Sequence, residues 1–404
     1  MSKNNILHVV TNPPVSSNRL TLQLQYTSER YSVSIVDLSG KSKCNVIDGS
    51  YVLISSPKSM RVDSKSKIIR FVLACFSGII RVLWLSWYLT FSKCEVLHAH
   101  ENPTLPALVF WKLILRRKAI WDPHDYFHET YEKSKSLITR MVGKFYLALE
   151  SLVLKTDITV ICVSEGMRNL YESKYGKLKT IKILNYSAMR PVDWQRQNQE
   201  DCEVHFSDFF RRPLRLVYAG QILEERIELG LIETIGRIDA VELDIWGADG
   251  RTGYSKRISE FIRANGLRNI KFMGRYKADD LCDHIKDYDF AIIPYPKSEK
   301  NIDFCLPNKF FQYLQAGLPL ITSNLSEIGS LVSDHNLGYV FKEGNYDELE
   351  RVLKEIVSTD CISLMSMKKN IKKYNRHMIC YESQAKLLCY AYDSLINQRS
   401  GGLR

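Results

Sequence analysis

The sequence lacks the motifs that identify several common enzyme classes. It contains no G-x-G-x-x-G, no G-x-x-x-x-G-K-[ST] and no G-x-S-x-G pattern. These absences exclude the simplest dinucleotide-binding, P-loop and α/β-hydrolase interpretations. Short repeats and low-complexity segments are absent too, and a composition of 45% hydrophobic and 25% charged residues is that of a globular protein.

Cysteine pairs at metal-binding or redox spacing are also missing. The ten cysteines are scattered and form no C-x-x-C pair. This pattern indicates small buried side chains in a reduced compartment, not a disulfide framework or a zinc site. The first residues show no signal-peptide pattern and predict a short tail that leads into a strand. We therefore expect a cytoplasmic protein.

The two halves of the chain differ in charge. Residues 1–200 contain 28 Lys and Arg against 16 Asp and Glu, a balance of +12, whereas residues 201–404 contain 28 against 29, a balance of −1. All of the net charge of +11 therefore comes from the first half. This asymmetry predicts that the first half faces something anionic, such as a membrane surface, a diphosphate or nucleic acid. A basic face that serves only solubility is the alternative.

One strongly apolar segment, residues 68–91, has the length of a membrane span. Arg70 and Arg81 interrupt it, and a charge near the bilayer centre is unfavourable. The helical spacing of its apolar residues predicts a buried crossover helix. Because the preceding stretch, KSMRVDSKSK, is basic, a helix that packs on a sheet and also touches lipid at that end is a second interpretation. A true span is a third.

Alternation of apolar runs with helical patterns predicts two domains. Residues 1–188 and residues 214–375 each show short β-branched runs separated by helical segments, which is typical of a parallel sheet covered on both faces. The polar stretch 189–213 is predicted to link them, and 376–404 to form a helical tail that can pack back on the first domain. We expect an α/β protein with two Rossmann-like domains that face a cleft.

Ligands of open α/β sheets bind at the carboxyl ends of the strands, so polar residues after strands are candidate ligand contacts. In the second domain, Arg226 follows the strand 214–220, at the first turn of a helix expected from about residue 225. Cations and helix N-termini together suit phosphate. An Arg that is merely exposed in the first turn is the alternative.

The stretch CLPNKFFQYLQAGLPLI, residues 305–321, carries a second polar set. Helical spacing predicts that Asn308, Lys309 and Gln312 share one face, with Phe310 and Leu314 turned toward the core. Such a face, with free N–H donors, suits a diphosphate with a ribose nearby. Asn308 as a plain helix cap is the alternative.

Histidines and carboxylates follow two strands of the first domain. His98, His100 and Glu101 lie in VLHAHEN, and Asp122 and His124 lie in WDPHDYFHE. No closing set of metal ligands is evident, so hydrogen bonding to sugar hydroxyls or a proton-transfer role is predicted instead of zinc binding. The D-x-D at 287–289 leads straight into a strand and is interpreted as structural.

These segments resemble the retaining glycosyltransferases of family 4, which have the GT-B fold. VYAGQILEER, VELDIWGADG and LPNKFFQYLQAGLPLITS follow that family's order and spacing, while VLHAHENPTLPAL and WDPHDYFHE are similar to its first-domain signatures. The resemblance covers almost the whole chain and is strongest over about 214–345. It implies that this chain uses a nucleotide sugar.

The resemblance also implies roles for single residues. Arg226 and Gln221 match positions where the family has Lys and Arg contacting the donor diphosphate. Of the family's two motif acids, spaced by seven residues, the first falls on Phe304 and the second, which binds the ribose, falls on Gln312. His124 matches the family's His that reaches the sugar at the reaction centre, and is the expected catalytic residue.

The first-domain loop of the family is normally rich in glycine, whereas this chain has TNPPVSSNR. Residues of this loop can substitute for the missing glycines: Ser16, Ser17, Asn18 or Arg19. Together with these, candidate contacts to the acceptor or the sugar are Asn18, Arg19, His100, Glu101 and Asp122.

The function implied is transfer of a sugar, with retention, from a UDP- or GDP-sugar to a glycan or a polyprenyl-diphosphate-linked acceptor in surface-polysaccharide synthesis. No metal or cofactor is expected, and no nucleic acid. The basic first half would touch the inner membrane face. Because both motif acids are missing, a non-catalytic GT-B module that binds a partner transferase or a glycan is an alternative, and a nucleotide-sugar epimerase is another.

Overall fold

The chain forms two compact units, and each is described by itself. The first comprises Met1–Leu184 and Tyr381–Arg404, and the second Asn185–Cys380. The computed structural model describes residues 3–11, 18–39, 45–47, 51–57, 67–184, 212–250, 253–277, 280–359, 361–378 and 381–397. The linker predicted at 189–213 lies outside these ranges except for its last two residues.

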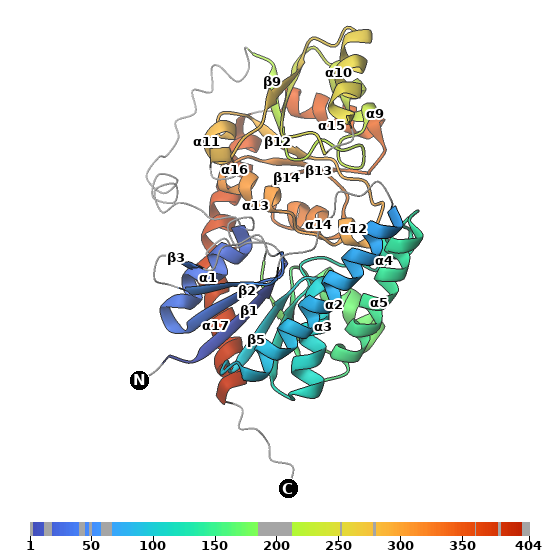
Figure 1. The fold of residues 1–404 in the computed structure, drawn as a ribbon. Coiled ribbons are helices and arrows are strands. Elements are labelled where there is room, and N and C mark those ends of the chain that lie inside the picture. Colours follow the sequence, from blue (N-terminus) through green and yellow to red (C-terminus); the bar gives the residue numbers. More distant parts are fainter. Residues whose placement is uncertain are drawn as a thin grey trace. The chain divides into compact units, whose positions relative to one another are not determined.

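The first unit is a sheet with helices on both of its faces (Figure 1). Its elements, in chain order, are β1 (Asn5–Val10), α1 (Asn18–Arg30), β2 (Ser32–Asp37), β3 (Asn45–Ile47), β4 (Tyr51–Ser55), α2 (Lys67–Phe91), β5 (Val96–His100), the 3-10 turn η2 (Asn102–Thr104), α3 (Leu105–Val109), the π-helical turn η3 (Phe110–Ile114), β6 (Lys118–Asp122), α4 (His128–Glu132), α5 (Leu137–Leu154), β7 (Thr159–Cys162), α6 (Glu165–Tyr175), β8 (Lys179–Lys182) and α17 (Tyr381–Asn397).

Its eight strands lie in the order β3-β4-β2-β1-β5-β6-β7-β8. All neighbours run parallel except β3, which pairs antiparallel with β4. Strands added after β1 extend the sheet first to one side and then, from β5 on, to the other. The order therefore reverses between β1 and β5, which are hydrogen-bonded neighbours.

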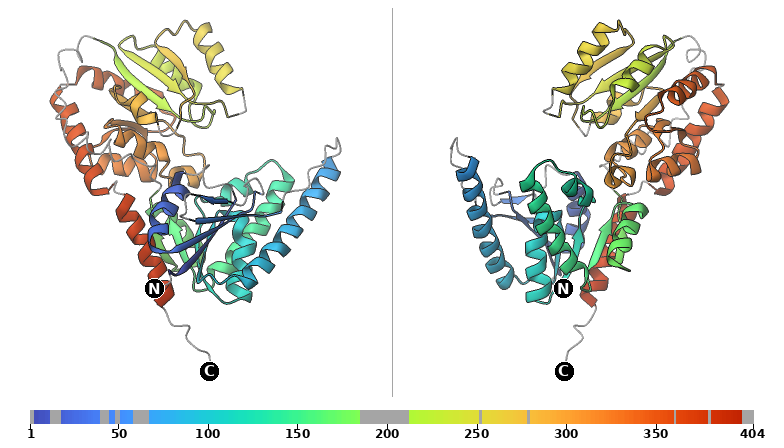
Figure 2. Two further views of the ribbon diagram at one scale, coloured as in Figure 1. Left: turned by 60° about the vertical axis from the view of Figure 1, so that its left-hand side comes forward. Right: turned by 90° about the vertical axis from the view of Figure 1, so that its right-hand side faces the viewer.

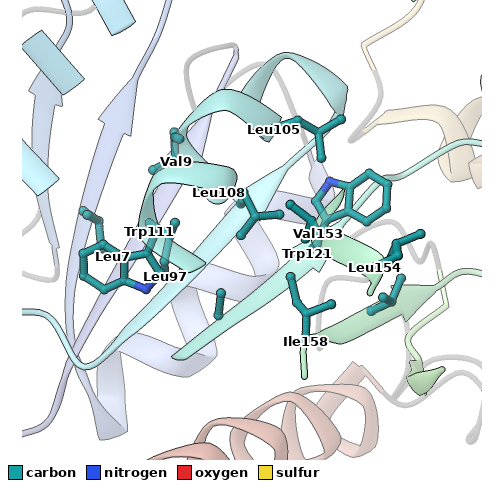
Figure 3. Packing of buried hydrophobic residues seen from close by; sticks show 14 of the residues in the cluster. Leu7, Val9, Leu97, Leu105, Leu108, Trp111, Trp121, Val153, Leu154 and Ile158 are labelled. Atoms are coloured by element: carbon teal, nitrogen blue, oxygen red, sulfur yellow. The ribbon is translucent and has the colours of Figure 1, made fainter. Parts of the chain in front are cut away.

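Each face of this sheet has its own core. On one face, α2, α3 and α5 bury apolar side chains such as Leu89, Leu108 and Val153 around Trp111 and Trp121 (Figure 3). On the other face, α1 and α17 pack against alternate residues of the same strands. Alternate side chains of a strand point to opposite faces, which is why both faces of these central strands are apolar.

The helix α17 belongs to the first unit although it ends the described sequence (Figure 2). The Tyr31 hydroxyl donates to the carbonyl of Cys389 at 3.0 Å and to Asp393 Oδ1 at 2.7 Å. The backbone N–H of Leu184 donates to Gln384 Oε1 at 3.1 Å. Residues 361–378, by contrast, form a helix of the second unit, so the return to the first unit begins at Tyr381 and not at residue 376.

The second unit is a wholly parallel sheet in the order β11-β10-β9-β12-β13-β14. The order reverses between β9 and β12. Helix α9 contacts α10 and α15, while α13 contacts α11 and α16. Its elements are β9 (Leu214–Ala219), α9 (Leu229–Gly236), β10 (Val241–Trp246), α10 (Tyr254–Ala264), β11 (Ile270–Gly274), α11 (Leu281–Ile285), β12 (Phe290–Ile293), α12 (Lys300–Asp303), α13 (Asn308–Gln315), β13 (Leu320–Ser323), α14 (Ser326–Asp334), β14 (Gly338–Phe341), α15 (Tyr346–Ser358) and α16 (Cys361–Met378).

The predicted fold class is thus confirmed: the chain is an α/β protein with two Rossmann-like parallel sheets. The apolar segment 68–91 forms the crossover helix α2 between β4 and β5, with Leu85 and Leu89 in the core. Among the described helices, none has the length and hydropathy needed to cross a bilayer.

Candidate functional site

The candidate residues gather where the strand order reverses in each sheet. Loops that follow strands on either side of such a point run in opposite directions and leave room for a ligand beside the carboxyl ends. In the first unit this point lies after β1 and β5, where Thr11 and Glu101 follow the strands. In the second unit it lies after β9 and β12, where Gly220 and Tyr295 are found.

Lys309 is a buried lysine of the second unit. Only 7% of the residue is exposed, and Nζ has no hydrogen-bond partner among the described residues. Nζ lies 4.5 Å from the ring centre of Tyr218 and 5.1 Å from that of Tyr295. Burial, and next the charge of Arg226, hold the Lys309 pKa well below its usual range. A buried amine that lacks an anionic partner is costly, so this position favours an anion that arrives as a ligand.

Arg226 lies beside it. Its guanidinium donates to the Tyr295 hydroxyl at 3.2 Å and lies over the same ring at 5.2 Å. The prediction of a helix from about residue 225 was wrong: residues 224–226 form a turn, and α9 begins at Leu229. Arg226 is therefore held by Tyr295 and not by the first turn of a helix. We refer to Lys309, Arg226, Tyr218 and Tyr295 as the cation group.

Because Gly220 has no side chain, the end of the Lys309 side chain can lie against its Cα. A Cβ at Gly220 would lie 1.9 Å from Lys309 Nζ and 2.9 Å from Cε, so the end of the lysine side chain would have to move if Gly220 were replaced. Gly247 supports this turn in the same way, because its own Cβ would lie 1.7 Å from the Gly220 carbonyl oxygen. Its φ of 151° is also one that L side chains rarely adopt.

The other candidate residues of the second unit divide into exposed and buried ones. Gln221 is exposed, and its backbone carbonyl accepts a 2.7 Å hydrogen bond from the Tyr218 hydroxyl. Asn308 opens α13 and is also exposed, whereas Gln312 is 7% exposed beside Lys309 on the same helix. Of the three residues predicted to share one face, only Lys309 and Gln312 are buried.

Two carboxylates of the second unit, Asp303 and Asp289, already form hydrogen bonds within the protein. Phe304 ends α12 at the position of the first motif acid. The adjacent Asp303 accepts from the backbone N–H of Ser326 at 2.7 Å and from its hydroxyl at 2.8 Å, at the start of α14. Asp289, in the D-x-D, accepts from Arg212 and from the backbone N–H of Arg215, which agrees with a structural role.

In the first unit, Glu101 and His124 follow the neighbouring strands β5 and β6. Both have a φ of 62°, which is rare for residues other than glycine and is often found at functional sites. Glu101 Oε1 lies 3.7 Å from His124 Nδ1, and the Thr11 hydroxyl donates to the other oxygen of Glu101. The strained turns thus present a carboxylate and an imidazole side by side.

Asp122 is buried beneath the turn that carries His124 and forms hydrogen bonds that hold this turn in place. Its carboxylate is fully buried and lies 2.9 Å from Arg19 Nη2, and it also accepts from Gln23 at 3.3 Å and from the backbone N–H of His124 at 3.4 Å. The prediction that Arg19 and Asp122 contact the acceptor or sugar is thereby altered: they form a buried ion pair with each other. Asn18 begins α1, but its side chain lies outside the described residues.

His100 belongs to a buried set of histidines. His8 Nδ1 lies 3.0 Å from His100 Nε2, and His100 Nδ1 lies 3.2 Å from His124 Nε2. His98 Nδ1 lies 2.7 Å from the Tyr392 hydroxyl of α17. His8 was missed from the sequence because ILHVV reads as an ordinary strand; its in-register pairing with His98 places the two rings together.

Two groups have ligand atoms close enough for a metal, and both share His100. The first group consists of His8, His98 and His100. The second consists of His100, Asp122 and His124. Every ring nitrogen that joins His8, His100 and His124 already has a hydrogen-bond partner in the protein. Hydrogen bonding between the rings and metal ligation are therefore two alternative uses of the same ring nitrogens.

Residues 213–359 match the family described as glycosyl transferases group 1. This segment, which is less than half of the chain, is similar to group 1 glycosyltransferases. It contains all of the cation group, together with Gln221, Asn308 and Gln312. No curated protein matches the chain at a significant level.

Solved glycosyltransferases share the fold of the whole chain. Sucrose-phosphate synthase from Thermosynechococcus elongatus superimposes with a TM-score of 0.73 at 12% identity, over 97% of this chain and 99% of that one. HepE from Anabaena in complex with UDP superimposes with a TM-score of 0.66 at 13% sequence identity, over 97% of this chain and 100% of that one. WaaG, a glycosyltransferase involved in lipopolysaccharide biosynthesis, superimposes with a TM-score of 0.63 at 14% sequence identity, over 98% of this chain and 100% of that one. At these identities the likeness establishes the GT-B fold and nothing more.

Replacing Gly220 by Ala tests the cation group. The new Cβ would displace Lys309 Nζ, so we expect the affinity for UDP or GDP, measured by calorimetry, to fall about ten- to hundredfold, as for a lost charged hydrogen bond. Gly78→Ala is the matched control, because a Cβ there meets nothing within 4 Å. If the two variants bind the nucleotide with equal affinity, Lys309 does not contribute to nucleotide binding.

The buried histidines predict a pH dependence of stability. Burial lowers the pKa of His8 to about 3, and the pKa values of His98 and His100 fall well below normal for the same reason. The unfolded chain therefore binds more protons below about pH 6.5, and the free energy of unfolding decreases as the pH falls, by up to ~1.4 kcal/mol per pH unit for each histidine. Urea unfolding at about pH 7.5 and about pH 5.5 measures this, with His8→Asn as a variant of smaller slope. A free energy of unfolding that is the same at both pH values would contradict it.

Proposed function

We propose that this protein transfers a sugar, with retention, from a UDP- or GDP-sugar to a glycan or lipid-linked glycan acceptor in surface-polysaccharide synthesis. The observation that carries the proposal is the pair of cations at the strand-order reversal of the group 1 domain. Lys309 Nζ is buried without a partner, and Arg226 lies on the same tyrosine ring. A diphosphate supplies the negative charge that this position lacks.

Catalysis in this proposal is electrostatic. As the bond between the sugar and the diphosphate breaks, negative charge develops on the leaving phosphate, and Lys309 and Arg226 stabilise it. The surroundings are already desolvated, so the interaction is stronger than in water. These two side chains take the part that a divalent metal plays in other sugar transferases.

Gln312 binds the ribose in place of the family's second acid. Its amide both donates and accepts hydrogen bonds, and within the described residues its side chain forms no hydrogen bond that a ribose would have to replace. HepE, which has the same fold, is known in complexes with UDP and with UDP-glucose. This neighbour supports a uridine nucleotide as the first donor to test.

His124 contacts the transferred sugar. Its ring is 21% exposed and is placed by a strained turn beside Glu101, which suits hydrogen bonding to sugar hydroxyls. His100 and Asp122 hold it from the protein side. Asn18 and Glu101 are the remaining candidates for contacts with the acceptor.

A second candidate function is a non-catalytic module that binds a nucleotide sugar, a glycan or a partner transferase. The observation that favours it is the absence of both motif acids: Phe304 occupies one position and Gln312 the other. Binding without turnover would identify this case.

We further propose that the first unit contacts the inner surface of the cytoplasmic membrane. Helices α2 and α5 cover the same face of the sheet and expose apolar residues four positions apart. On α5 these are Leu137, Met141 and Phe145; on α2 they are Leu83, Trp87 and Phe91, all more than half exposed. Arg140 and Lys144 are exposed between those of α5, which suits an anionic lipid surface.

Replacing Arg226 by Ala tests the catalytic role. Loss of a charge-assisted contact to the leaving phosphate should lower kcat/KM about ten- to hundredfold in a transfer assay with the donor found by thermal shift. Arg257→Ala is a matched control, because Arg257 also lies over a tyrosine ring but is exposed and paired with Glu224. Unchanged turnover in Arg226→Ala would exclude it from the mechanism.

Replacing Met141 and Phe145 together by Glu tests the membrane contact. Flotation with vesicles that contain anionic lipid should recover at least about tenfold less of this variant than of the wild type, because apolar contact is lost and like charge is introduced. Ile362→Glu, at a residue of the second unit that is 73% exposed, is the control. Equal recovery of all three proteins would refute the contact.

A further inference from the structure

The histidine cluster continues beyond the candidate catalytic residue into the core of the first unit. From the surface inward, hydrogen-bond distances join His124 to His100 at 3.2 Å, His100 to His8 at 3.0 Å, and His8 to the Tyr392 hydroxyl at 3.4 Å. Tyr392 then contacts His98 at 2.7 Å. The series links three strands of the sheet to the helix α17, whose sequence lies more than 250 residues away from His124.

A series of neutral imidazoles can be arranged in only two ways. Each neutral ring has one N–H donor and one acceptor nitrogen, so a ring that accepts at one nitrogen must donate at the other. Burial lowers the pKa values of His8, His98 and His100, which keeps these rings neutral near neutral pH. Among the three rings of His8, His100 and His124, the direction of one hydrogen bond therefore fixes the direction of the other.

The inner end favours one direction. His98 Nε2 is buried with no hydrogen-bond partner among the described residues. A buried N–H donor without an acceptor costs more than an unused acceptor, so the proton of His98 belongs on Nδ1, which donates to the Tyr392 hydroxyl. The Tyr392 hydroxyl can accept from His98 and at the same time donate to His8, and in that direction His8 Nδ1 donates to His100 and His100 Nδ1 to His124 Nε2.

The outer end favours the same direction independently. When His124 accepts at Nε2, its proton lies on Nδ1, which faces the carboxylate of Glu101 at 3.7 Å. The opposite direction would turn a lone pair toward that carboxylate. Asp122 lies equally far from His124 Nε2, at 3.7 Å, but its charge is already matched by Arg19 at 2.9 Å.

We propose that His100, His8 and Tyr392 are positioning residues that hold His124 in its Nδ1–H tautomer. His124 therefore meets a ligand as a hydrogen-bond donor at Nδ1 and not as a base at that atom. The catalytic meaning of this tautomer rests on the function proposed above, whereas the tautomer itself does not.

Nitrogen-15 NMR of the full chain with labelled histidine tests the tautomer directly. Long-range proton–nitrogen correlations distinguish protonated from unprotonated ring nitrogens, and the spectrum of His124→Gln identifies the signals of His124. Near neutral pH, His124 should show a protonated Nδ1 and an unprotonated Nε2. A wild-type His124 that is protonated at Nε2 would overturn the proposal.

Two variants of the α17 interface provide the matched comparison. Tyr392→Phe and Tyr31→Phe each remove one hydroxyl that joins the first unit to α17, but only Tyr392 belongs to the histidine series. His124 should become a mixture of tautomers in Tyr392→Phe and in His100→Phe, and should stay unchanged in Tyr31→Phe. If His100→Phe does not fold, Tyr392→Phe still decides. A tautomer that is identical in the wild type and in folded Tyr392→Phe refutes the series.

Kinetics and metal analysis separate the remaining outcomes. With a working donor, Tyr392→Phe should lower kcat by about tenfold at an unchanged donor KM, as for the loss of one hydrogen bond from a correctly oriented His124, whereas Tyr31→Phe should not. If a chelator shifts the signals of His8, His98 and His100, the cluster is a metal site and the proposal fails. A chain that shows the Nδ1–H tautomer but binds no nucleotide sugar supports the series and refutes the proposed function.

Discussion

The reversal of strand order in each parallel sheet is the constraint on which the rest of this structure depends. Parallel strands place all their carboxyl ends at one edge, and only at the reversal do the following loops separate. In the second unit this point lies between β9 and β12, and the cation group forms there. In the first unit it lies between β1 and β5, beside Glu101 and His124.

The buried charged groups at the two reversals differ in whether they have a partner of opposite charge in the protein. In the first unit, Asp122 is fully buried and its charge is matched by Arg19, and the histidines below it are neutral and hydrogen-bonded to one another. In the second unit, Lys309 is buried without an acid, between two tyrosine rings. The first arrangement matches its buried charge within the protein, whereas the second leaves the Lys309 amine without an anionic partner among the described residues.

The sequence predicted the fold well because periodicity and turn chemistry are local properties. Strands and crossover helices appeared near their predicted places, and the helix after Pro307 ends as Gly317 predicts. Prediction failed where a side chain's partner lies far along the chain. Arg19 was taken for an open contact but pairs with Asp122, and Tyr295 was not recognised as the residue that holds Arg226 and Lys309. The apolar run FAIIPY gave no signal of that role.

The sequence by itself determined two parallel α/β sheets, the strands after which polar residues follow, and the loss of both motif acids at Phe304 and Gln312. The tertiary structure decided which of those polar residues meet. The pairing of β1 with β5 places His8 opposite His98 and within hydrogen-bond distance of His100, and the return of α17 to the first unit places Tyr392 beside them. These contacts depend on strand pairing and helix docking between distant segments, which local sequence patterns do not encode.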